Sequence, residues 1–308
     1  MSIMSEIEVP AELATTQSKY NGEAGRAWIA SLPRLAADHL ERWDLTITGG
    51  SMHGMASLVL PVRTSDGTPA ALKLQILDEE TESEPVGLRL WDGDAAVRLL
   101  RSDETTGVML LERLDSARSL SSVPDDTKAL QILTELLARL VAHPAPEGMR
   151  RLGDIAQAML DQVPSALPTF HTDEERRVVQ TCAAVVSDLV AEPGDRLLHW
   201  DLHYDNVLAG EREPWLAIDP KPLAGDPGFD LLPAIDNRWD EIVATGDVGR
   251  AVRRRFDLMV EILGLDRQRA VGWTYGRVLQ NVLWDVEDGE EQMDGVQRAI
   301  AEALYPYL

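Results

Sequence analysis

The chain has one cysteine, Cys182, among its 308 residues. A disulfide within the chain is therefore excluded, and the composition fits a reducing compartment. Cys182 lies in the stretch VVQTCAAVVSDLV, whose apolar residues recur at helical spacing. We interpret its thiol as a core group and not as a nucleophile.

Long apolar runs are also missing. No stretch approaches the roughly 18 apolar residues that a membrane-spanning helix requires. The first residues, MSIMSEIEVPAEL, carry acid where a secretion signal has a basic segment followed by an apolar one. We therefore expect a cytoplasmic protein with no membrane partner. Hydrophobic residues make up 44% of the chain, and its length favours two lobes or domains.

Basic residues are scarce, with 29 Lys and Arg against 52 Asp and Glu and a formal charge of −23. Such a surface repels phosphate backbones, so a nucleic-acid partner is not expected. The same charge would attract a cationic small molecule. Solubility or adaptation to salt is an equally acceptable explanation for the acidic composition.

The first third of the chain predicts a helix followed by antiparallel strands. RAWIASLPRLAADHLERW has helical periodicity, and Pro33 is expected to break or restart the helix. The next segment, LTITGGSMHGMASLVLPVRTSDGTPAALKLQIL, predicts a strand, a glycine loop and two strands joined by a turn at Asp66-Gly67. Alternation in AALKLQI places Lys73 on the face opposite its leucine neighbours.

A helix is expected from Glu84 to about Trp91, followed by the strands VRLLRSD and GVMLLERL. Beyond them helices dominate, as in KALQILTELLARLVAH with its leucine stripe. We predict an α+β protein with two lobes. The N-terminal lobe, residues 1–113, contains an antiparallel sheet. The C-terminal lobe, 114–308, is mainly helical, with a hinge at about 112–118.

The stretch LLHWDLHYDN, residues 197–206, concentrates two of only six histidines beside two aspartates. Three interpretations compete. His199, Asp201 and His203 alternate, as ligands of zinc or manganese on a strand would, but the other histidines are scattered. The segment could equally be a polar turn. In the third interpretation it is a phosphoryl-transfer loop.

The third interpretation requires an Asp to accept a proton and, five residues later, an Asn to hold Mg²⁺. Asp201 and Asn206 have that spacing. NVLAGEREPWLAIDP predicts a hairpin whose return strand ends at Asp219. Because the first residue of one antiparallel strand lies beside the last of the other, Asn206 and Asp219 are expected to meet as oxygen ligands of Mg²⁺.

Phosphoryl transfer also needs a cation and backbone donors for the nucleotide phosphates. Lys73 is the single lysine of the N-terminal strands, and Glu84 is its expected partner, with Glu82 as the alternative. The glycine loop GGSMHGMAS supplies Gly49, Gly50 and Gly54. Glycines between two strands usually form only a turn, but this loop precedes the lysine in the order that a phosphate-binding loop would.

In this order the motifs resemble the small-molecule branch of the protein-kinase-like fold. The form HxDxHxxN is similar to that of aminoglycoside phosphotransferases, and closest to the group of streptomycin 6-phosphotransferases and hydroxyurea phosphotransferases. The resemblance runs from about residue 43 to 231. It rests on the segments HGMASLVLPVRTSDGTPAALKLQ, LRLWDGDAAVRLL, LLERLD, LLHWDLHYDNVL and WLAIDPKPLAGDPGFDL.

The resemblance implies a use of ATP and Mg²⁺, with Asp201 as the catalytic base or as the group that orients the substrate hydroxyl. It implies that the backbone from Glu112 to Leu114 hydrogen-bonds adenine. Four further residues would support the catalytic loop without touching substrate: His199, His203, Asp226 and Asp230.

Trp200 departs from the family, whose members commonly have glycine between the histidine and the aspartate of this loop. Its ring could narrow the site or pack underneath it. A pocket for a cationic sugar would need carboxylates and stacking rings. The candidates in the C-terminal lobe are Asp236, Trp239, Trp284 and Asp285, which could also be ordinary helix-face and core residues.

The leading hypothesis is a kinase that phosphorylates a hydroxyl of a streptomycin-type aminoglycoside, or hydroxyurea, and so gives antibiotic resistance. A kinase of the same fold that acts on a metabolite is the second hypothesis. The third is a nucleotide-binding protein without turnover, against which the presence of Asp201 argues.

Overall fold

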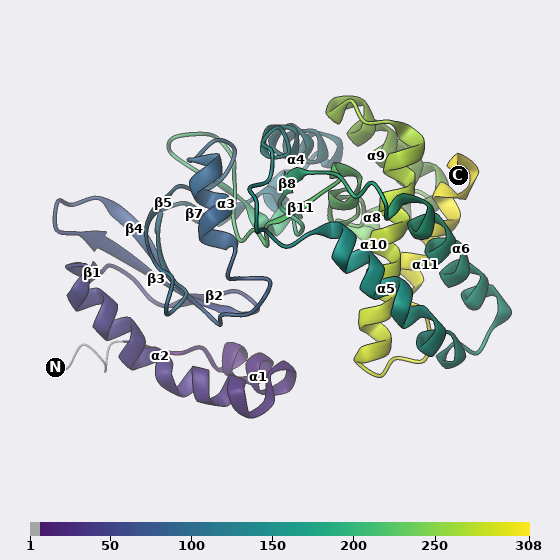
Figure 1. Ribbon diagram of the computed structural model, residues 1–308. Helices are drawn as coiled ribbons and strands as arrows, with labels where there is room; N and C mark the ends of the chain where they lie inside the picture. Colours follow the sequence, from purple (N-terminus) through teal and green to yellow (C-terminus); the bar gives the residue numbers. More distant parts are fainter. Residues whose placement is uncertain (1–6) are drawn as a thin grey trace. The chain divides into compact units, whose positions relative to one another are not determined.

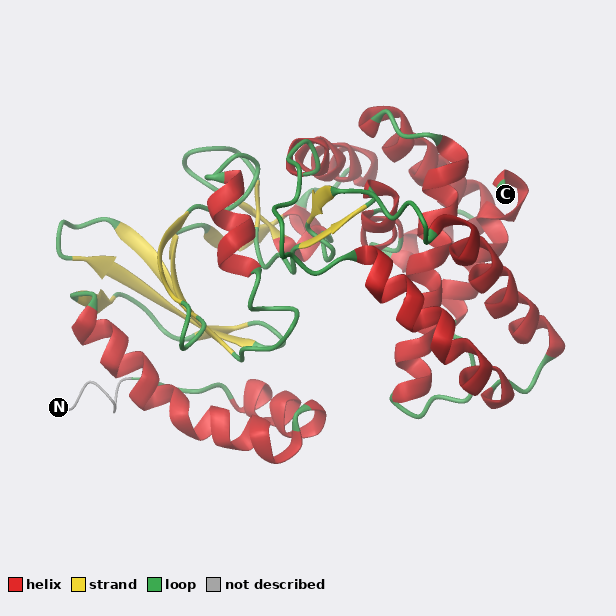
Figure 2. Cartoon of the chain, viewed as in Figure 1, coloured by secondary structure: helices red, strands yellow, loops and turns green. Residues whose placement is uncertain are grey.

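The computed structural model describes residues 7–308, which form two compact units. Unit 1 contains the described residues up to Ser116 together with Ala209–Pro214, and unit 2 contains Ala117–Leu208 and Trp215–Leu308. Unit 1 holds an antiparallel sheet and unit 2 is mainly helical (Figure 2), so the predicted fold class is confirmed. The return of 209–214 to unit 1 was not anticipated. Within residues 7–308, no helix combines the length and apolarity needed to span a membrane.

Unit 1 is built on an antiparallel sheet with the strand order β1-β3-β4-β6-β5, to which β2 is added beside β3. The turn at Asp66-Gly67 joins β3 and β4 as predicted, with Gly67 in the left-handed region at φ +89°. The elements are α1 (Ala11–Tyr20), α2 (Gly22–Arg42), β1 (Leu45–Ile47), β2 (Met52–His53), β3 (Ser57–Thr64), β4 (Pro69–Gln75), α3 (Glu84–Trp91), β5 (Leu99–Asp103) and β6 (Val108–Glu112).

Helix α2 covers one face of this sheet (Figure 1) and continues without interruption through Pro33. The expected break at Pro33 is therefore wrong. Proline removes one backbone hydrogen bond of the helix, but the helix buries a stripe against the sheet that includes Leu32, Ala36 and Leu40. The free energy gained by that burial offsets the lost bond.

Alternation in β4 gives its two faces different partners. Leu72 and Leu74 belong to the core shared with α2, so Lys73 lies on the opposite face. Helix α3 begins at Glu84 and ends at Trp91 as predicted, with Pro85 in its first turn. Pro85 lacks only an N–H that the first turn leaves unpaired in any case.

Unit 2 is organised around α10, which is buried almost throughout from Ala270 to Leu283 and packs against α5, α6 and α11. The predicted capping box of Thr172 and Glu175 opens α6. The elements from the division onward are β7 (Asp115–Ser119), α4 (Asp126–Leu140), α5 (Leu152–Ala166), α6 (Asp173–Leu189), β8 (Arg196–Leu198), β9 (Val207–Ala209), β10 (Leu216–Ala217), β11 (Leu223–Gly225), α7 (Leu232–Ile235), α8 (Trp239–Ala244), α9 (Val248–Leu263), α10 (Arg267–Glu287) and α11 (Gly295–Leu304).

Short strands in unit 2 carry the crowded decapeptide. β8 leads into it and pairs antiparallel with β11, while β9 and β10 form the predicted hairpin behind it. β9 also lies between β10 and β7 in a three-stranded sheet. Cys182 is buried in α6, which confirms its assignment to the core.

Replacing Gly25 by alanine should destabilise the protein, although alanine is normally the better helix former by about 1 kcal/mol. A Cβ at Gly25 would overlap the backbone carbonyl of Gln17 in α1. We expect the free energy of unfolding to fall by about 1–2 kcal/mol, as is usual for overpacking. Gly295→Ala is the control, since a Cβ there meets nothing. Denaturant titration of both variants would reject this account if Gly25→Ala were as stable as the control.

Candidate active site

The loop that follows β8 is held by Asp230, a fully buried carboxylate. Its two oxygens accept hydrogen bonds from the backbone N–H groups of His199 and Trp200, each at 2.9 Å. Burial raises the pKa of Asp230 to about 7, against the lowering effect of the His199 N–H and of the Arg277 guanidinium. Asp230 thus has the supporting position that was expected for it.

The ring of His199 is also buried and links the loop to the residue before Asp219. Nε2 lies 3.1 Å from the carbonyl oxygen of Ile218, and Nδ1 accepts the N–H of Asp201 at 3.3 Å. Nε2 must therefore carry the proton, and burial lowers the pKa of the ring to about 4. With both nitrogens bound to backbone, His199 has no lone pair for a metal.

The zinc interpretation of the decapeptide therefore loses its first ligand. Residues 7–308 contain no cluster of three or more His, Cys, Asp or Glu side chains arranged to hold a metal ion.

His203 contributes to the loop through its backbone carbonyl oxygen, which accepts the N–H of Asn206 at 3.0 Å. Its ring makes no hydrogen bond to any described residue, so the support expected from that side chain is not seen.

Asn206 and Asp219 occupy the same end of the β9–β10 hairpin. The N–H of Ile218 donates to the carbonyl of Asn206 at 2.9 Å, and Asp219 follows at once with φ +58°. The side-chain nitrogen of Asn206 donates to the backbone carbonyl of Asp201 at 2.8 Å. This bond fixes which end of the amide is nitrogen, so the amide oxygen is the end left to bind a cation.

Asp201 is a partly accessible acid of the loop, and Asp205 is the more exposed one. The side chain of Asp201 is 28% exposed, whereas His199 and Asn206 beside it are buried. The backbone around it is fixed by Asp230, His199 and Asn206 together. The carboxylate is therefore presented at a defined position where a substrate hydroxyl can reach it.

The Trp200 side chain packs underneath the loop and is 2% exposed. The guanidinium carbons of Arg150 and Arg277 lie 4.2 and 5.1 Å from its ring, and its Nε1–H donates to Gln280 at 3.2 Å. Trp284 lies at its edge, with ring centroids 5.9 Å apart. Of the two possibilities for this ring, packing below the loop is the one observed.

Asp226 was expected to support the catalytic loop, but its side chain bonds other groups. Its carboxylate caps the turn Pro227–Asp230 by accepting the N–H of Gly228 at 2.8 Å, and it pairs with Arg269 of α10 at 2.5 Å. Asp226 does not bond the catalytic loop in the described structure. It fixes the turn that carries Asp230, so its support of the loop is indirect.

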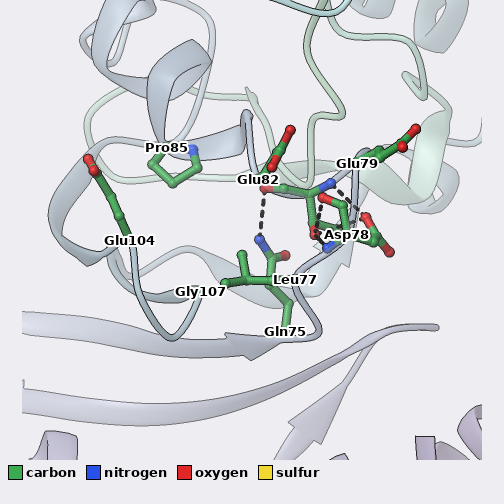
Figure 3. Close-up of a pocket in the computed structure, with 9 residues that line it drawn as sticks. Gln75, Leu77, Asp78, Glu79, Glu82, Pro85, Glu104 and Gly107 are labelled. Atoms are coloured by element: carbon green, nitrogen blue, oxygen red, sulfur yellow. Dashed lines mark hydrogen bonds between the residues drawn. The ribbon is translucent and has the colours of Figure 1, made fainter. Parts of the chain in front are cut away.

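In unit 1 the Lys73 ammonium lies 2.7 Å from both oxygens of Glu84, and both side chains are buried. Glu82, the alternative partner, is exposed and lines a separate cavity of about 290 Å³ (Figure 3). The predicted pair with Glu84 is therefore present, and the alternative with Glu82 is wrong. The pair is desolvated and doubly hydrogen-bonded, a geometry that holds the ammonium in one place.

The glycine loop is more ordered than the sequence indicated. β2 lies within it and pairs with β3, and the N–H of Gly54 donates to the carbonyl of Ser57 at 3.0 Å. Gly49, Gly50 and Gly54 are all exposed. None has a positive φ, so none needs the backbone freedom of glycine. What these residues offer an approaching ligand is the absence of a side chain.

Part of the expected hinge is hydrogen-bonded to other residues of unit 1. The N–H of Glu112 donates to Arg98 at 2.9 Å, and its carboxylate binds Arg212 at 2.7 Å. The N–H of Glu112 is therefore not available to adenine. Leu114 is buried, and the backbone of Arg113 and Leu114 remains the predicted contact.

The proposed substrate residues fall into two groups. Asp236 interacts electrostatically with Asp201 and Arg277, and burial raises its pKa to about 7. Asp285 belongs to an acidic end of α10, where burial and then Asp294, Glu290 and Asp288 raise its pKa. Asp236, but not Asp285, thus interacts with Asp201. Trp239 is partly buried at the start of α8, and Trp284 is 39% exposed.

Two supporting residues were missed by sequence reasoning. Asn237 accepts the N–H of Tyr204 in the loop at 3.0 Å. Arg277 faces both Trp200 and Trp284. Neither belongs to a recognisable motif, although Asn237 directly follows Asp236, one of the candidate substrate residues.

Asp230→Asn should loosen the loop, because an amide offers one acceptor oxygen where two N–H groups need one each. At pH 8, above the pKa of about 7, we expect a loss of about 1–3 kcal/mol in the free energy of unfolding. Asp195→Asn makes the same chemical change at an exposed position and serves as the control. Equal denaturation midpoints for the two variants would contradict the assigned role.

Comparisons with known proteins place this geometry in a family. An aminoglycoside phosphotransferase crystallised as a ternary complex with ADP and hygromycin B has the same fold, with a TM-score of 0.60 at 16% identity over 90% of this chain and 98% of the other. A streptomycin 6-kinase of Streptomyces glaucescens is 58% identical over 99% of each chain. A hydroxyurea phosphotransferase of Kitasatospora aureofaciens is 54% identical over 97% of this chain and 86% of its own.

The family model for aminoglycoside/hydroxyurea antibiotic resistance kinases matches residues 42–289. This span includes the Lys73–Glu84 pair, the catalytic loop and the β9–β10 hairpin. Together with the identity over nearly the whole chain, the match shows that the protein belongs to the family of aminoglycoside/hydroxyurea antibiotic resistance kinases.

Proposed function

We propose that the protein transfers the γ-phosphoryl group of ATP, with Mg²⁺, to a hydroxyl of a streptomycin-type aminoglycoside. The observation that carries the reaction type is the presentation of Asp201: an accessible carboxylate on a loop whose backbone is bonded by the buried side chains of Asp230 and Asn206. The near-full-length identity to streptomycin 6-kinase supports the substrate class.

In this proposal Asp201 orients the acceptor hydroxyl and takes its proton. The phosphoryl transition state is loose, so catalysis depends on position and electrostatics more than on covalent chemistry. The contacts of Asp230 and His199 with the loop fix the Asp201 backbone before substrate arrives. Pre-organisation of this kind lowers the barrier because no reorganisation is needed during the reaction.

Asn206 and Asp219 would hold Mg²⁺, which when bound neutralises charge on the phosphate oxygens. The donor set fits a hard cation: an amide oxygen, whose direction the Asn206 bond to Asp201 fixes, and a carboxylate at the same hairpin end. Lys73, held by Glu84, would position the nucleotide phosphates. The exposed glycine loop would cover them, and the backbone at Arg113 and Leu114 would bind adenine.

For the substrate, Asp236 is the carboxylate best placed to meet a cationic group, because Asp201 is close enough to add to the effect of burial in raising the pKa of Asp236. The formal charge of −23 favours approach of a cation in general. Trp284, exposed at the edge of Trp200, offers a ring for a sugar face. Trp239 and Asp285 remain proposed contributors to substrate binding. The case for Asp285 is weaker than the case for Asp236.

Hydroxyurea is the second candidate substrate, favoured by the 54% identity to a hydroxyurea phosphotransferase. It is small and uncharged and has no need of Asp236. The two candidates can therefore be separated by a variant that removes this carboxylate.

The first test measures ADP release by the purified protein with Mg-ATP and a panel of streptomycin, other aminoglycosides and hydroxyurea. We expect streptomycin to stimulate turnover. Asp201→Ala should reduce kcat by at least about a thousandfold and leave Mg-ATP affinity, measured by calorimetry, within a fewfold of wild type. Asp219→Ala is the contrasting variant, since it should weaken Mg-ATP binding itself. If ATP binds and no compound stimulates turnover, a metabolite kinase becomes the better proposal.

The affinity for streptomycin should rise with pH. The pKa of Asp236 is about 7, so this carboxyl is mostly neutral at pH 6 and mostly charged at pH 8, and only the charged form attracts a cation. We expect Kd to fall several-fold across this range for the wild type and to be nearly flat for Asp236→Asn. Calorimetric titrations at pH 6, 7 and 8 measure this. A wild-type Kd independent of pH would remove Asp236 from the binding site.

A further inference from the structure

Lys221 is held against the catalytic loop by backbone contacts on both sides of Asp219. On one side the carbonyl of Ile218 bonds the His199 ring at 3.1 Å. On the other, the N–H of Lys221 donates to the carbonyl of His199 at 3.0 Å. The left-handed conformation of Asp219, φ +58°, turns the chain between these two points. Lys221 therefore has a fixed place beside the loop.

The side chain of Lys221 is directed at the catalytic aspartate. Its Nζ lies 3.8 Å from Oδ2 of Asp201, with the two side chains 34% and 28% exposed. An ion pair this exposed contributes only about 0–1 kcal/mol to stability. At 3.8 Å the contact is also too long for a hydrogen bond. The ion pair with Asp201 by itself is therefore a weak reason for an ammonium at this place.

The chemistry of the loop gives a better reason. The acceptor hydroxyl must lie against the Asp201 carboxylate when it attacks, so the incoming phosphoryl group must come within one bond length of that hydroxyl oxygen. A group 3.8 Å from the carboxylate is thereby within reach of the phosphoryl oxygens, where transition-state charge is spread. Lysine is a compact cation with three rotatable donors, suited to such a target.

We propose that Lys221 is a catalytic residue, which donates to the transferring phosphoryl group in the transition state. The inference rests on the proposed kinase reaction. In that step the acceptor oxygen forms a bond to phosphorus, the bond from phosphorus to the ADP oxygen breaks with its electron pair leaving on ADP, and the hydroxyl proton passes to Asp201. Lys221 keeps its proton throughout and acts by charge.

The first experiment removes the charge and keeps the length of the side chain. Lys221→Met should lower kcat by about 100- to 1000-fold, the usual effect of losing one transition-state donor. The Kd values for Mg-ATP and streptomycin and the melting temperature should stay close to wild type. Lys128→Met is the matched control, because Lys128 is exposed on α4. Unchanged kcat, or a Mg-ATP affinity lost in parallel with kcat, would overturn the proposal.

The second experiment restores the charge chemically. Cys182 is fully buried, and burial raises the pKa of its thiol to about 12, so a cysteine placed at position 221 is the thiol that alkylates in the native protein. Treating Lys221→Cys with 2-bromoethylamine rebuilds an ammonium of nearly the same length. We expect recovery to within about tenfold of wild-type kcat, and no recovery with the neutral reagent iodoacetamide. Equal recovery with both reagents would contradict a role for charge.

A third measurement needs no acceptor turnover. Mg-ADP with aluminium fluoride mimics the transferring phosphoryl group, so Lys221→Met should weaken its binding at least tenfold without changing the Kd of Mg-ADP alone. If the wild type turns over none of the panel and this dependence persists, the proposed substrate fails and the role of Lys221 holds. If the variant binds the mimic like wild type, the inference fails whatever the substrate is.

Discussion

The two hydrogen bonds from the catalytic loop to Asp230 are the contact on which the site depends. They hold the backbone at His199 and Trp200 in place, and this backbone in turn positions the neighbouring residues of the site. The His199 ring then reaches the carbonyl before Asp219 and accepts the backbone N–H of Asp201. A buried carboxylate is costly to desolvate, and the raised pKa of Asp230 reflects that cost. In exchange, the carboxylate satisfies two backbone N–H groups of the loop and fixes its conformation at His199 and Trp200.

Trp200 shows how the chain tolerates a bulky residue in a left-handed backbone conformation. Its φ of +69° lies in the left-handed region, which costs a non-glycine residue about 1–2 kcal/mol. The indole contacts two guanidinium groups and donates a hydrogen bond to Gln280, and burial of so large a ring is worth more than that strain. The residue therefore packs in the interior beneath the loop and stabilises it.

Much of this could be predicted from local sequence, because the signals are local. The alternation of β4 predicted the face on which Lys73 lies. The antiparallel pairing of a hairpin predicted that Asn206 lies beside Asp219, and Pro85 indicated the start of α3. Contacts between distant segments had no such signal. Nothing near Asp226 indicates that it pairs with Arg269 and not with the loop. Helix α2 passes Pro33 because tertiary burial outweighs one lost hydrogen bond, a balance that periodicity does not contain.

The segment Ala209–Pro214 has a consequence for how the protein is made. Arg212 in this segment binds the Glu112 carboxylate at 2.7 Å and the Ala96 carbonyl at 3.1 Å, so unit 1 is completed by residues that follow more than ninety positions later in the chain. Domains usually fold in order as they leave the ribosome. Here the contacts of Arg212 with Glu112 and Ala96 can form only after Ala117–Leu208, which belong to the second unit, have been synthesised. The last contacts of the amino-terminal unit therefore form late in translation.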